Sequence, residues 1–165
     1  MSWKLIHRNG ESFEAAFSLL NKNDITQLRK REGWSRGIDW SDYLRNDQDF
    51  TAYRLHIMGD DQTQGLIALA VRAGFVELGF VEKAPSNKTA DKAFMNAGEL
   101  LFAHACLSSL ESNGDGYVLL QAKSKLKDYY IDHYGMEVVS LRRNLLAIPP
   151  VESRRLIELY WNQRS

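Results

Sequence analysis

Residues 119–136 read Leu-Leu-Gln-Ala-Lys-Ser-Lys-Leu-Lys-Asp-Tyr-Tyr-Ile-Asp-His-Tyr-Gly-Met. The apolar residues at the start belong to a strand that we expect over 117–122, and the run over 125–134 predicts a short helix. Gly135 suits the left-handed conformation with which many helices end. A long helix expected at about 93–112 precedes the strand, and a strand reached through a helical crossover lies parallel to its neighbour.

The middle of the chain predicts three strands in succession. Apolar residues alternate over 53–57, and two nearly continuous apolar runs follow over 66–71 and 75–81. Gly59-Asp60-Asp61 and Ala73-Gly74 supply the turns between them. We therefore expect a three-stranded antiparallel meander here.

The N-terminal part predicts one strand and two helices. Trp3–Arg8 is a strand that ends at Asn9-Gly10. Over residues 11–22, four apolar residues recur at helical spacing and predict an amphipathic helix, namely Phe13, Ala16, Phe17 and Leu20. Asp24 is a suitable cap for a second helix that runs to about Arg31.

The C-terminal part completes the pattern. Residues 136–148 predict one or two strands, and Pro149-Pro150 introduces a terminal helix. We expect Leu156, Leu159 and Tyr160 to form the buried stripe of that helix. The order of elements predicts an α/β (α+β) fold with a mixed sheet. No internal repeat or linker divides the chain, so residues 1–165 are expected to form a single domain.

Composition excludes several classes of protein. The chain has 165 residues with 21 basic and 21 acidic side chains, so a strongly basic nucleic-acid or anionic-membrane binder is not expected. One cysteine allows neither an internal disulfide nor a cysteine-based zinc site, and the four histidines show no metal-ligand spacing. No apolar run approaches the ~20 residues that cross a bilayer. The N-terminus lacks the apolar core of a signal peptide, so we expect a cytoplasmic protein.

The stretch Glu77–Leu101 contains a candidate anion site. A strand and a polar loop lead into a helix, whose first N–H groups and dipole favour a negative charge. Gly98 would let a ligand approach the backbone, and Asn96 tolerates a left-handed conformation. Two structural alternatives stay open. Asn96 caps the helix with Glu99 as its capping-box partner, or the helix begins several residues earlier.

Two adjacent tyrosines, Tyr129 and Tyr130, lie in the short helix. A tyrosine hydroxyl has an intrinsic pKa of about 10, which is reasonably matched to a leaving thiolate that needs a proton. The structural alternative is that these side chains pack as amphipathic aromatics together with Tyr134. His104 and Cys106 lie in the apolar part of the long helix, and we expect both to be core residues.

This combination resembles the GNAT superfamily of acyl-CoA-dependent N-acetyltransferases. Residues 126–136 are similar to the family's short helix with an aromatic–tyrosine pair and a glycine stop, and residues 93–98 occupy the place of its pyrophosphate-binding motif. The resemblance covers about residues 50–148. Three further segments resemble a bacterial branch of the superfamily, namely Glu82–Pro85, Leu101–Cys106 and Ala122–Leu126.

The resemblance implies a GNAT-like fold, with a mixed, mostly antiparallel central sheet flanked by helices and an added C-terminal helix. It implies acetyl-CoA as the acyl donor, no metal, and direct transfer of the acetyl group to a primary amine of a small molecule or peptide. The implied cofactor-binding residues are Val81, Glu82, Lys83, Asn96, Ala97, Gly98, Glu99 and Leu100. The backbone of Val81–Lys83 would pair with the pantetheine arm, and Asn96–Leu100 would hold the pyrophosphate, helped by Lys88 and Lys92.

Within the same resemblance, Tyr130 is the candidate acid that protonates the CoA thiolate, with Tyr129 as the alternative. Glu82 is the candidate base, ahead of Glu77, and the structural alternative for both is a solvent-facing strand charge. Four residues stand where the family shapes its acceptor pocket or where a Trp-rich cover would lie, namely Trp34, Asp39, Trp40 and Tyr43. A homodimer is compatible with the family, and neither nucleic acid nor membrane is an expected partner.

Two departures from the family pattern support a rival hypothesis. Ala93 stands where the motif has Gln or Arg, and Asn96 stands at its first glycine. A non-catalytic GNAT-fold module that binds a ligand or a protein would tolerate both changes. A nucleic-acid-associated factor that uses the basic residues within 123–165 is a third hypothesis, which the neutral total disfavours.

Overall fold

The computed structural model describes residues 2–31, 33–35 and 38–162. In chain order the elements are β1 (Ser2–Ile6), β2 (Ser12–Leu19), α1 (Lys22–Arg29), the short 3-10 helix η1 (Trp40–Leu44), β3 (Thr51–Ile57), β4 (Thr63–Arg72), β5 (Phe75–Lys83), the 3-10 turn η2 (Pro85–Asn87), α2 (Ala97–Glu111), β6 (Val118–Gln121), α3 (Ser124–Tyr134), β7 (Glu137–Ser140), β8 (Leu145–Ile148), α4 (Pro150–Tyr160) and β9 (Trp161–Asn162).

The chain forms two compact units, and β4, β5 and α2 each contribute to both. Among the described residues, unit 1 comprises the chain up to Ala68, Phe80–Leu101 and the end from Tyr160. Unit 2 comprises Leu69–Gly79 and Phe102–Leu159.

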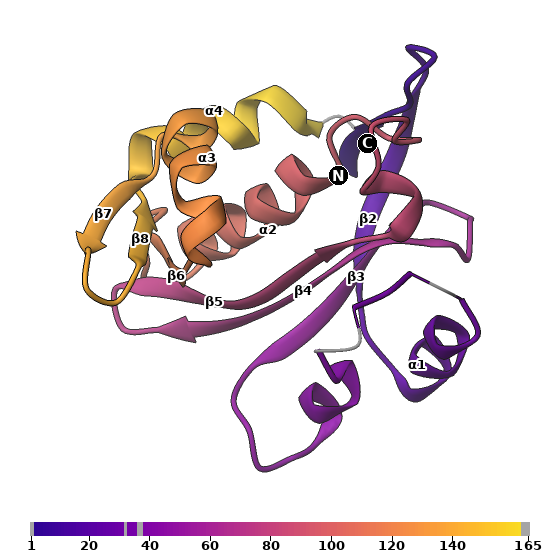
Figure 1. Ribbon diagram of the computed structural model, residues 1–165, viewed down its shortest axis with the longest axis horizontal. Coiled ribbons are helices and arrows are strands. Elements are labelled where there is room, and N and C mark those ends of the chain that lie inside the picture. Colours follow the sequence, from indigo (N-terminus) through magenta and orange to yellow (C-terminus); the bar gives the residue numbers. More distant parts are fainter. Residues whose placement is uncertain (1, 32, 36–37, 163–165) are drawn as a thin grey trace. The chain divides into compact units, whose positions relative to one another are not determined.

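In unit 1 the strand order is β5-β4-β3-β2-β1-β9, and Figure 1 labels the first four of these strands. β1 and β2 form an antiparallel pair in which Trp3 lies opposite Ala15. β2 also pairs antiparallel with β3, from Ala15 opposite Ile57 to Leu19 opposite Tyr53. The hydrogen-bonding edges of β2 are therefore both occupied by neighbouring strands.

The helix expected over residues 11–22 is wrong, because residues 12–19 form strand β2. Helical spacing of the apolar residues did not reflect burial, since Ala15 alone among the residues of β2 is fully buried. The stronger signal was Asn9-Gly10, which is a hairpin turn rather than a mere strand end. Gly10 has a φ of +94°, and the backbone N–H of His7 bonds to the carbonyl of Glu11 across the turn at 2.8 Å.

α1 begins at Lys22, two residues before Asp24, which the sequence suggested as the cap. Asn21 is the cap: its side chain accepts a hydrogen bond from the Asp24 N–H at 2.9 Å, and the Asp24 carboxylate accepts one from the Asn21 N–H at 3.0 Å. This reciprocal capping box satisfies two N–H groups at the start of the helix.

The two faces of unit 1's strands are covered by different elements. Leu66 and Ala68 of β4 belong to a cluster with Ile25 and Leu28 of α1 and Trp40 of η1. Gly65 precedes Leu66 in β4, so a side chain at Gly65 would point to the opposite face of the strands. A Cβ atom added there would lie 3.0 Å from the Leu101 side chain of α2. Helix α1 and the start of α2 therefore lie on opposite faces, as Figure 1 shows.

In unit 2 the strand order is β7-β8-β6-β5-β4. The expected parallel pair is confirmed, with Val76 of β5 opposite Val118 of β6. β8 pairs antiparallel with both β6 and β7. Helix α3 ends as the sequence predicts at Gly135, which has a φ of +65°.

The buried stripe of the terminal helix α4 differs in part from the expectation. Leu156 is buried, but Leu159 is 52% exposed, and that part of the prediction is wrong. Ser153 and Ile157 complete the buried face, because the positions i, i+3 and i+4 share one side of a helix. The Ser153 hydroxyl donates a hydrogen bond to the Gly116 carbonyl.

The predicted fold class is confirmed: the strands form a mixed, mostly antiparallel sheet with one parallel pair described, accompanied by helices that include the C-terminal α4. Among the described residues, no helix combines the length and apolarity that a membrane span requires.

Candidate active site

The segment between β5 and α2 is fixed first by Asn87, which is fully buried. Its side-chain amide donates to the backbone carbonyl of Gln64 at 3.1 Å and to the Gln64 side chain at 3.0 Å. Its side-chain oxygen accepts a hydrogen bond from the Phe94 N–H at 3.0 Å. One asparagine therefore closes the loop from η2 to the residues before α2.

Residues 93–96 lie against β1 and the residues that follow it, and Phe94 forms an isolated antiparallel bridge with His7. The Met95 N–H donates to the Ile6 carbonyl at 2.8 Å, and the Arg8 N–H donates to the Ala93 carbonyl at 2.9 Å. The Asn96 side chain continues this ladder, since its oxygen accepts from the Ile6 N–H at 2.9 Å and its amide donates to the Lys4 carbonyl at 2.8 Å. The Asn96 side chain thus takes the place of a peptide group beside β1.

This docking corrects the start of the long helix, which was expected at about residue 93 and begins at Ala97. The Met95 N–H and the Ala93 carbonyl bond to Ile6 and Arg8 rather than to groups within a helix. Both polar atoms of the Asn96 side chain bond to β1, and the capping box between Asn96 and Glu99 stays a prediction. The backbone carbonyl of Asn96 accepts the first helical bond, from the Leu100 N–H at 3.0 Å.

Lysines lie close to the start of α2. Burial lowers the pKa of Lys83 first, and the positive charges of Lys92 and Lys88 lower it further, while the Glu99 carboxylate opposes them. These charges interact, so they occupy one neighbourhood. A helix N-terminus beside lysines suits a phosphate-bearing ligand, because N–H groups, helix dipole and ammonium groups all favour negative charge.

Glu82 is buried, with 5% of the residue exposed. Its carboxylate accepts hydrogen bonds from the Ser35 N–H, from the Trp40 indole N–H at 3.1 Å and from the Lys88 ammonium at 2.7 Å. The Lys88 ammonium also donates to the Gly33 carbonyl at 3.3 Å. The pair of Glu82 and Lys88 therefore ties the segment around residues 33–40 to the end of β5.

These contacts bear on both interpretations of Glu82. It is not a solvent-facing strand charge, and both of its oxygens already accept hydrogen bonds. A general base needs a lone pair within hydrogen-bonding reach of the incoming proton. Glu77, the second candidate, is half-exposed and forms an ion pair with Arg72 at 2.9 Å in unit 2.

Tyr130 lies on α3 in unit 2. Its ring meets the edge of Phe102 at a centroid distance of 5.4 Å. Burial, and to a smaller degree the neighbouring Tyr129, raises the pKa of Tyr130 above its ordinary value. Tyr129 is 50% exposed and stacks on His133 at 5.0 Å, whereas Tyr134 is buried. The three tyrosines therefore have different environments. Tyr129 is exposed, Tyr134 is buried, and Tyr130 is partly buried with its ring against Phe102 of α2.

The aromatic segment 33–50 both covers a core and lines cavities. Trp40 is buried in the cluster on the α1 face, and Trp34 and Tyr43 pack against that cluster. Trp34, Asp39 and Trp40 also line a cavity of about 700 Å³. Residues 36 and 37 lie outside the described residues. An acceptor pocket and a Trp-rich cover over the sheet, the two interpretations of this segment, are thus compatible.

The structure groups most of the expected site residues in unit 1. Val81, Glu82 and Lys83 end β5, and Asn96–Leu100 begin α2; Tyr130 belongs to unit 2. Sequence reasoning missed Asn87 and the partners of Glu82, because these contacts join residues far apart in the chain. His104 and Cys106 are largely buried as expected: burial lowers the pKa of His104 to about 4 and raises that of Cys106 to about 12. Within the described chain, no three His, Cys, Asp or Glu side chains gather as a metal site would need.

The strand order, the parallel β5–β6 pair and the helix that follows β5 define the GNAT fold, which confirms the expected resemblance at the level of fold. The solved structure of AtaTR bound with acetyl-CoA has a TM-score of 0.63 at 17% identity and covers 87% of this chain and 98% of that chain. FdhC, a nucleotide-linked sugar GNAT, has a TM-score of 0.59 at 15% identity, with 96% of both chains covered.

A third similar structure is the ribosomal-protein-S18-alanine N-acetyltransferase from Escherichia coli, with a TM-score of 0.55 at 13% identity over 82% of this chain and 93% of that chain. At the level of sequence, neither the family models nor the curated proteins compared with this chain gave a match. A shared fold hosts many functions, so the chemistry must be argued from the site.

Proposed function

We propose that this chain is an acetyl-CoA-dependent N-acetyltransferase that transfers an acetyl group directly to a primary amine of a small molecule or peptide. The observation that carries the proposal is the start of α2. Residues 93–96 are fixed on β1, so the helix N-terminus has a defined position, and the Lys83 ammonium interacts with the charges of Lys92 and of Glu99 in the first helical turn. An acetyl-CoA-bound structure among the similar folds supports the same donor.

The pyrophosphate of CoA would bind the backbone N–H groups of Ala97–Leu100, with Lys83 and Lys92 supplying positive charge. The backbone at Val81–Lys83 would pair with the pantetheine arm and hold the thioester. We assign Asn96 a positioning role, because its side chain is committed to β1 and fixes the helix start.

Tyr130 would act as the acid. The amine nitrogen forms a bond to the thioester carbonyl carbon, the carbon–sulfur bond breaks, and the leaving thiolate takes a proton from the tyrosine hydroxyl. The amine gives up a proton to water, and the tyrosinate takes a proton back from water. A raised pKa keeps Tyr130 protonated through neutral pH, so the donor form is the resting form.

Glu82 in this proposal is a positioning residue rather than the base. Its hydrogen bonds to Ser35 and Trp40 hold the aromatic segment over the end of β5. Holding amine and thioester together supplies much of the rate in reactions of this kind, so a strong base is not required.

Titration calorimetry with acetyl-CoA tests the proposal. Binding should be measurable at millimolar ligand or below, and no heat at that concentration would contradict it and favour a non-catalytic module. Tyr130→Phe should leave acetyl-CoA affinity within about twofold of wild type and lower turnover on an identified amine by about 100-fold or more. Tyr129→Phe is the matched control, because its ring is exposed and should leave turnover unchanged.

A further inference from the structure

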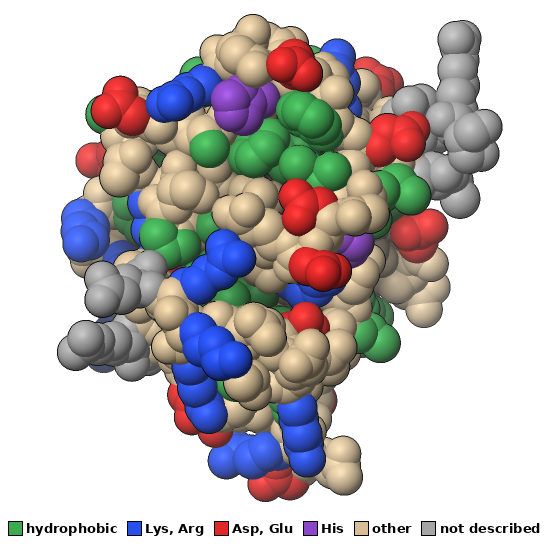
Figure 2. Space-filling view, turned by 90° about the vertical axis from the view of Figure 1, so that its right-hand side faces the viewer, with side chains coloured by type: hydrophobic (Ala, Val, Ile, Leu, Met, Phe, Trp, Pro, Cys, Tyr) green, Lys and Arg blue, Asp and Glu red, His purple; other side chains and the backbone are tan. Residues whose placement is uncertain are grey.

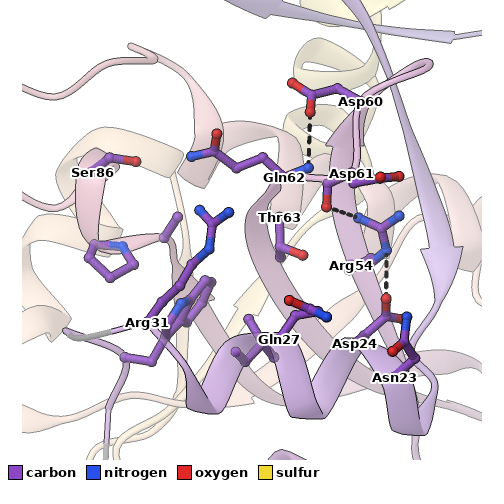
Figure 3. A pocket seen from close by; sticks show the side chains of 14 residues that line it. Asn23, Asp24, Gln27, Arg31, Arg54, Asp60, Asp61, Gln62, Thr63 and Ser86 are labelled. Atoms are coloured by element: carbon purple, nitrogen blue, oxygen red, sulfur yellow. Dashed lines mark hydrogen bonds and ion pairs between the residues drawn. The ribbon is translucent and has the colours of Figure 1, made fainter.

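Unit 1 contains a cavity of about 590 Å³ on the α1 face of the strands. Its walls come from α1 and the residues after it, from the turn between β3 and β4, and from η2. Figure 3 shows the Arg31 guanidinium directed into this space, with the side-chain ends of Gln62 and Ser86 directed toward the same space from two other segments.

These three side chains can all donate hydrogen bonds, and none of them has a side-chain partner among the described residues. Their backbone groups do form hydrogen bonds. The Arg31 N–H donates to the Leu28 carbonyl at 3.1 Å, and the Gln62 N–H donates to the Asp60 carboxylate at 3.1 Å. The side chains themselves are available to a ligand that accepts hydrogen bonds.

The other charged residues that line the cavity are either paired with each other or lie away from Arg31. Arg54 pairs with Asp24 at 3.4 Å and donates to the Asp61 carbonyl at 3.3 Å. The Asp60 and Asp61 carboxylates lie at the opposite end of the cavity from Arg31 (Figure 3). Around Arg31, therefore, the described side chains present positive charge and neutral donors.

The surface beside the cavity is also basic. Arg29, Lys30 and Arg31 follow one another at the end of α1 and all are exposed. Figure 2 shows several Lys and Arg side chains in the lower part of its face, with Asp and Glu side chains among them. Such a cluster raises the local concentration of anions.

The cavity is distinct from the candidate pyrophosphate site. It opens on the α1 face, whereas α2 begins on the opposite face of the same strands. A second anion-binding position on the α1 face is therefore available to a group other than the pyrophosphate of CoA.

We propose that this cavity binds the carboxylate or phosphate group of the acetyl acceptor, with Arg31 as the principal contact and Gln62 and Ser86 as neutral donors. The identification of the ligand as the acceptor rests on the proposed acetyltransferase function. A guanidinium can bind two oxygens of one such group at once. The acceptor is then an amine that also carries an anionic group.

Matched probes test this inference. Phosphoethanolamine is compared with ethanolamine, and β-alanine with propylamine, by titration calorimetry at fixed ionic strength. The anionic member of at least one pair should bind at least about tenfold more tightly than its partner. The same pairs serve in a thiol-release assay with acetyl-CoA, and the pair that is preferred distinguishes phosphate from carboxylate.

Arg31→Gln should remove most of the preference for the anionic probe. Lys30→Gln is the matched control, because Lys30 has the same charge at the same helix end but does not line the cavity; it should keep the preference. Equal binding within both pairs, or equal losses in the two variants, would overturn the inference.

Acetyl-CoA is titrated separately into the same proteins. Normal acetyl-CoA binding without any anion preference would leave the proposed function standing and refute the acceptor site. Preferential binding of an anionic probe that depends on Arg31, in a protein that does not bind acetyl-CoA, would confirm the anion site and refute its assignment to an acetyl acceptor.

Discussion

Replacing Asn96 by alanine removes two hydrogen bonds that no other side chain can supply. Asn96 is 3% exposed, and its amide bridges the Ile6 N–H and the Lys4 carbonyl at 2.9 and 2.8 Å. The variant leaves one donor and one acceptor of β1 without these partners. An unsatisfied buried group costs about 1–3 kcal/mol, and these sites are only partly buried, so we expect Asn96→Ala to lose about 2–3 kcal/mol of unfolding free energy.

For a chain of this size that loss corresponds to a Tm lower by about 4–12 °C. The Met95–Ile6 bond remains, so the variant should still fold at 25 °C, with the start of α2 less firmly held. Acetyl-CoA affinity, measured by calorimetry at 25 °C, should fall by about tenfold, because ordering the helix start then opposes binding.

Asn46→Ala is the control for this experiment, since Asn46 is exposed and no contact of its side chain is described. It should change neither Tm nor acetyl-CoA affinity. Asn96→Ala could instead have the same Tm as Asn46→Ala and the acetyl-CoA affinity of the wild type. In that case the docking of residues 93–96 on β1 does not organise the site, and the argument for the pyrophosphate position fails.

Three further predictions concern unit 2 and α2. Gly135→Ala should lose about 1–2 kcal/mol in urea unfolding, because the residue has a left-handed φ of +65° and the added Cβ would lie 2.6 Å from the Glu152 side chain. Cys106, whose pKa is about 12, should resist thiol reagents in the native protein and react after denaturation. Burial lowers the pKa of His104 to about 4 in the folded protein, against about 6.5 in the unfolded chain. The stability that neutral His104 contributes is therefore present above pH 6.5 and lost as the pH falls toward 4. His104→Gln should flatten the pH dependence of the urea midpoint.

Local signals predicted unit 2 well. Gly135 ends α3 as expected, and the crossover from α2 correctly predicted that β6 lies parallel to β5. Both features depend on residues close in sequence or on the handedness rules of the chain. The end of α3 and the direction of β6 therefore needed no knowledge of distant contacts.

β2 shows where such reasoning fails. Its apolar residues recur at helical spacing, yet pairing with β1 on one side and β3 on the other decides its conformation. Tertiary pairing overrides a local pattern when both edges of a segment are occupied. Asn9-Gly10 carried the needed information, because this dipeptide favours a hairpin over the end of an isolated strand.

The candidate site was predictable in its location but not in its contacts. The sequence placed Glu82 and Asn96 correctly at the end of a strand and next to a helix start. Their partners, Trp40 for Glu82 and Ile6 for Asn96, are 42 and 90 residues away in the chain. No periodicity reports such pairs, because each joins a side-chain polar group to a residue far away in the chain.

The end of β5 explains how these contacts could serve direct transfer. Successive residues of a strand point to opposite faces. Glu82 binds Ser35 and Trp40 on the α1 face, while Lys83 senses the charges of Lys92 and Glu99 near the start of α2. One strand end thereby organises the face that carries the candidate acceptor cavity and the face that carries the candidate pyrophosphate site. An acetyl donor held along the backbone of Val81–Lys83 would lie between the two, which is the arrangement that attack by an amine on a thioester requires.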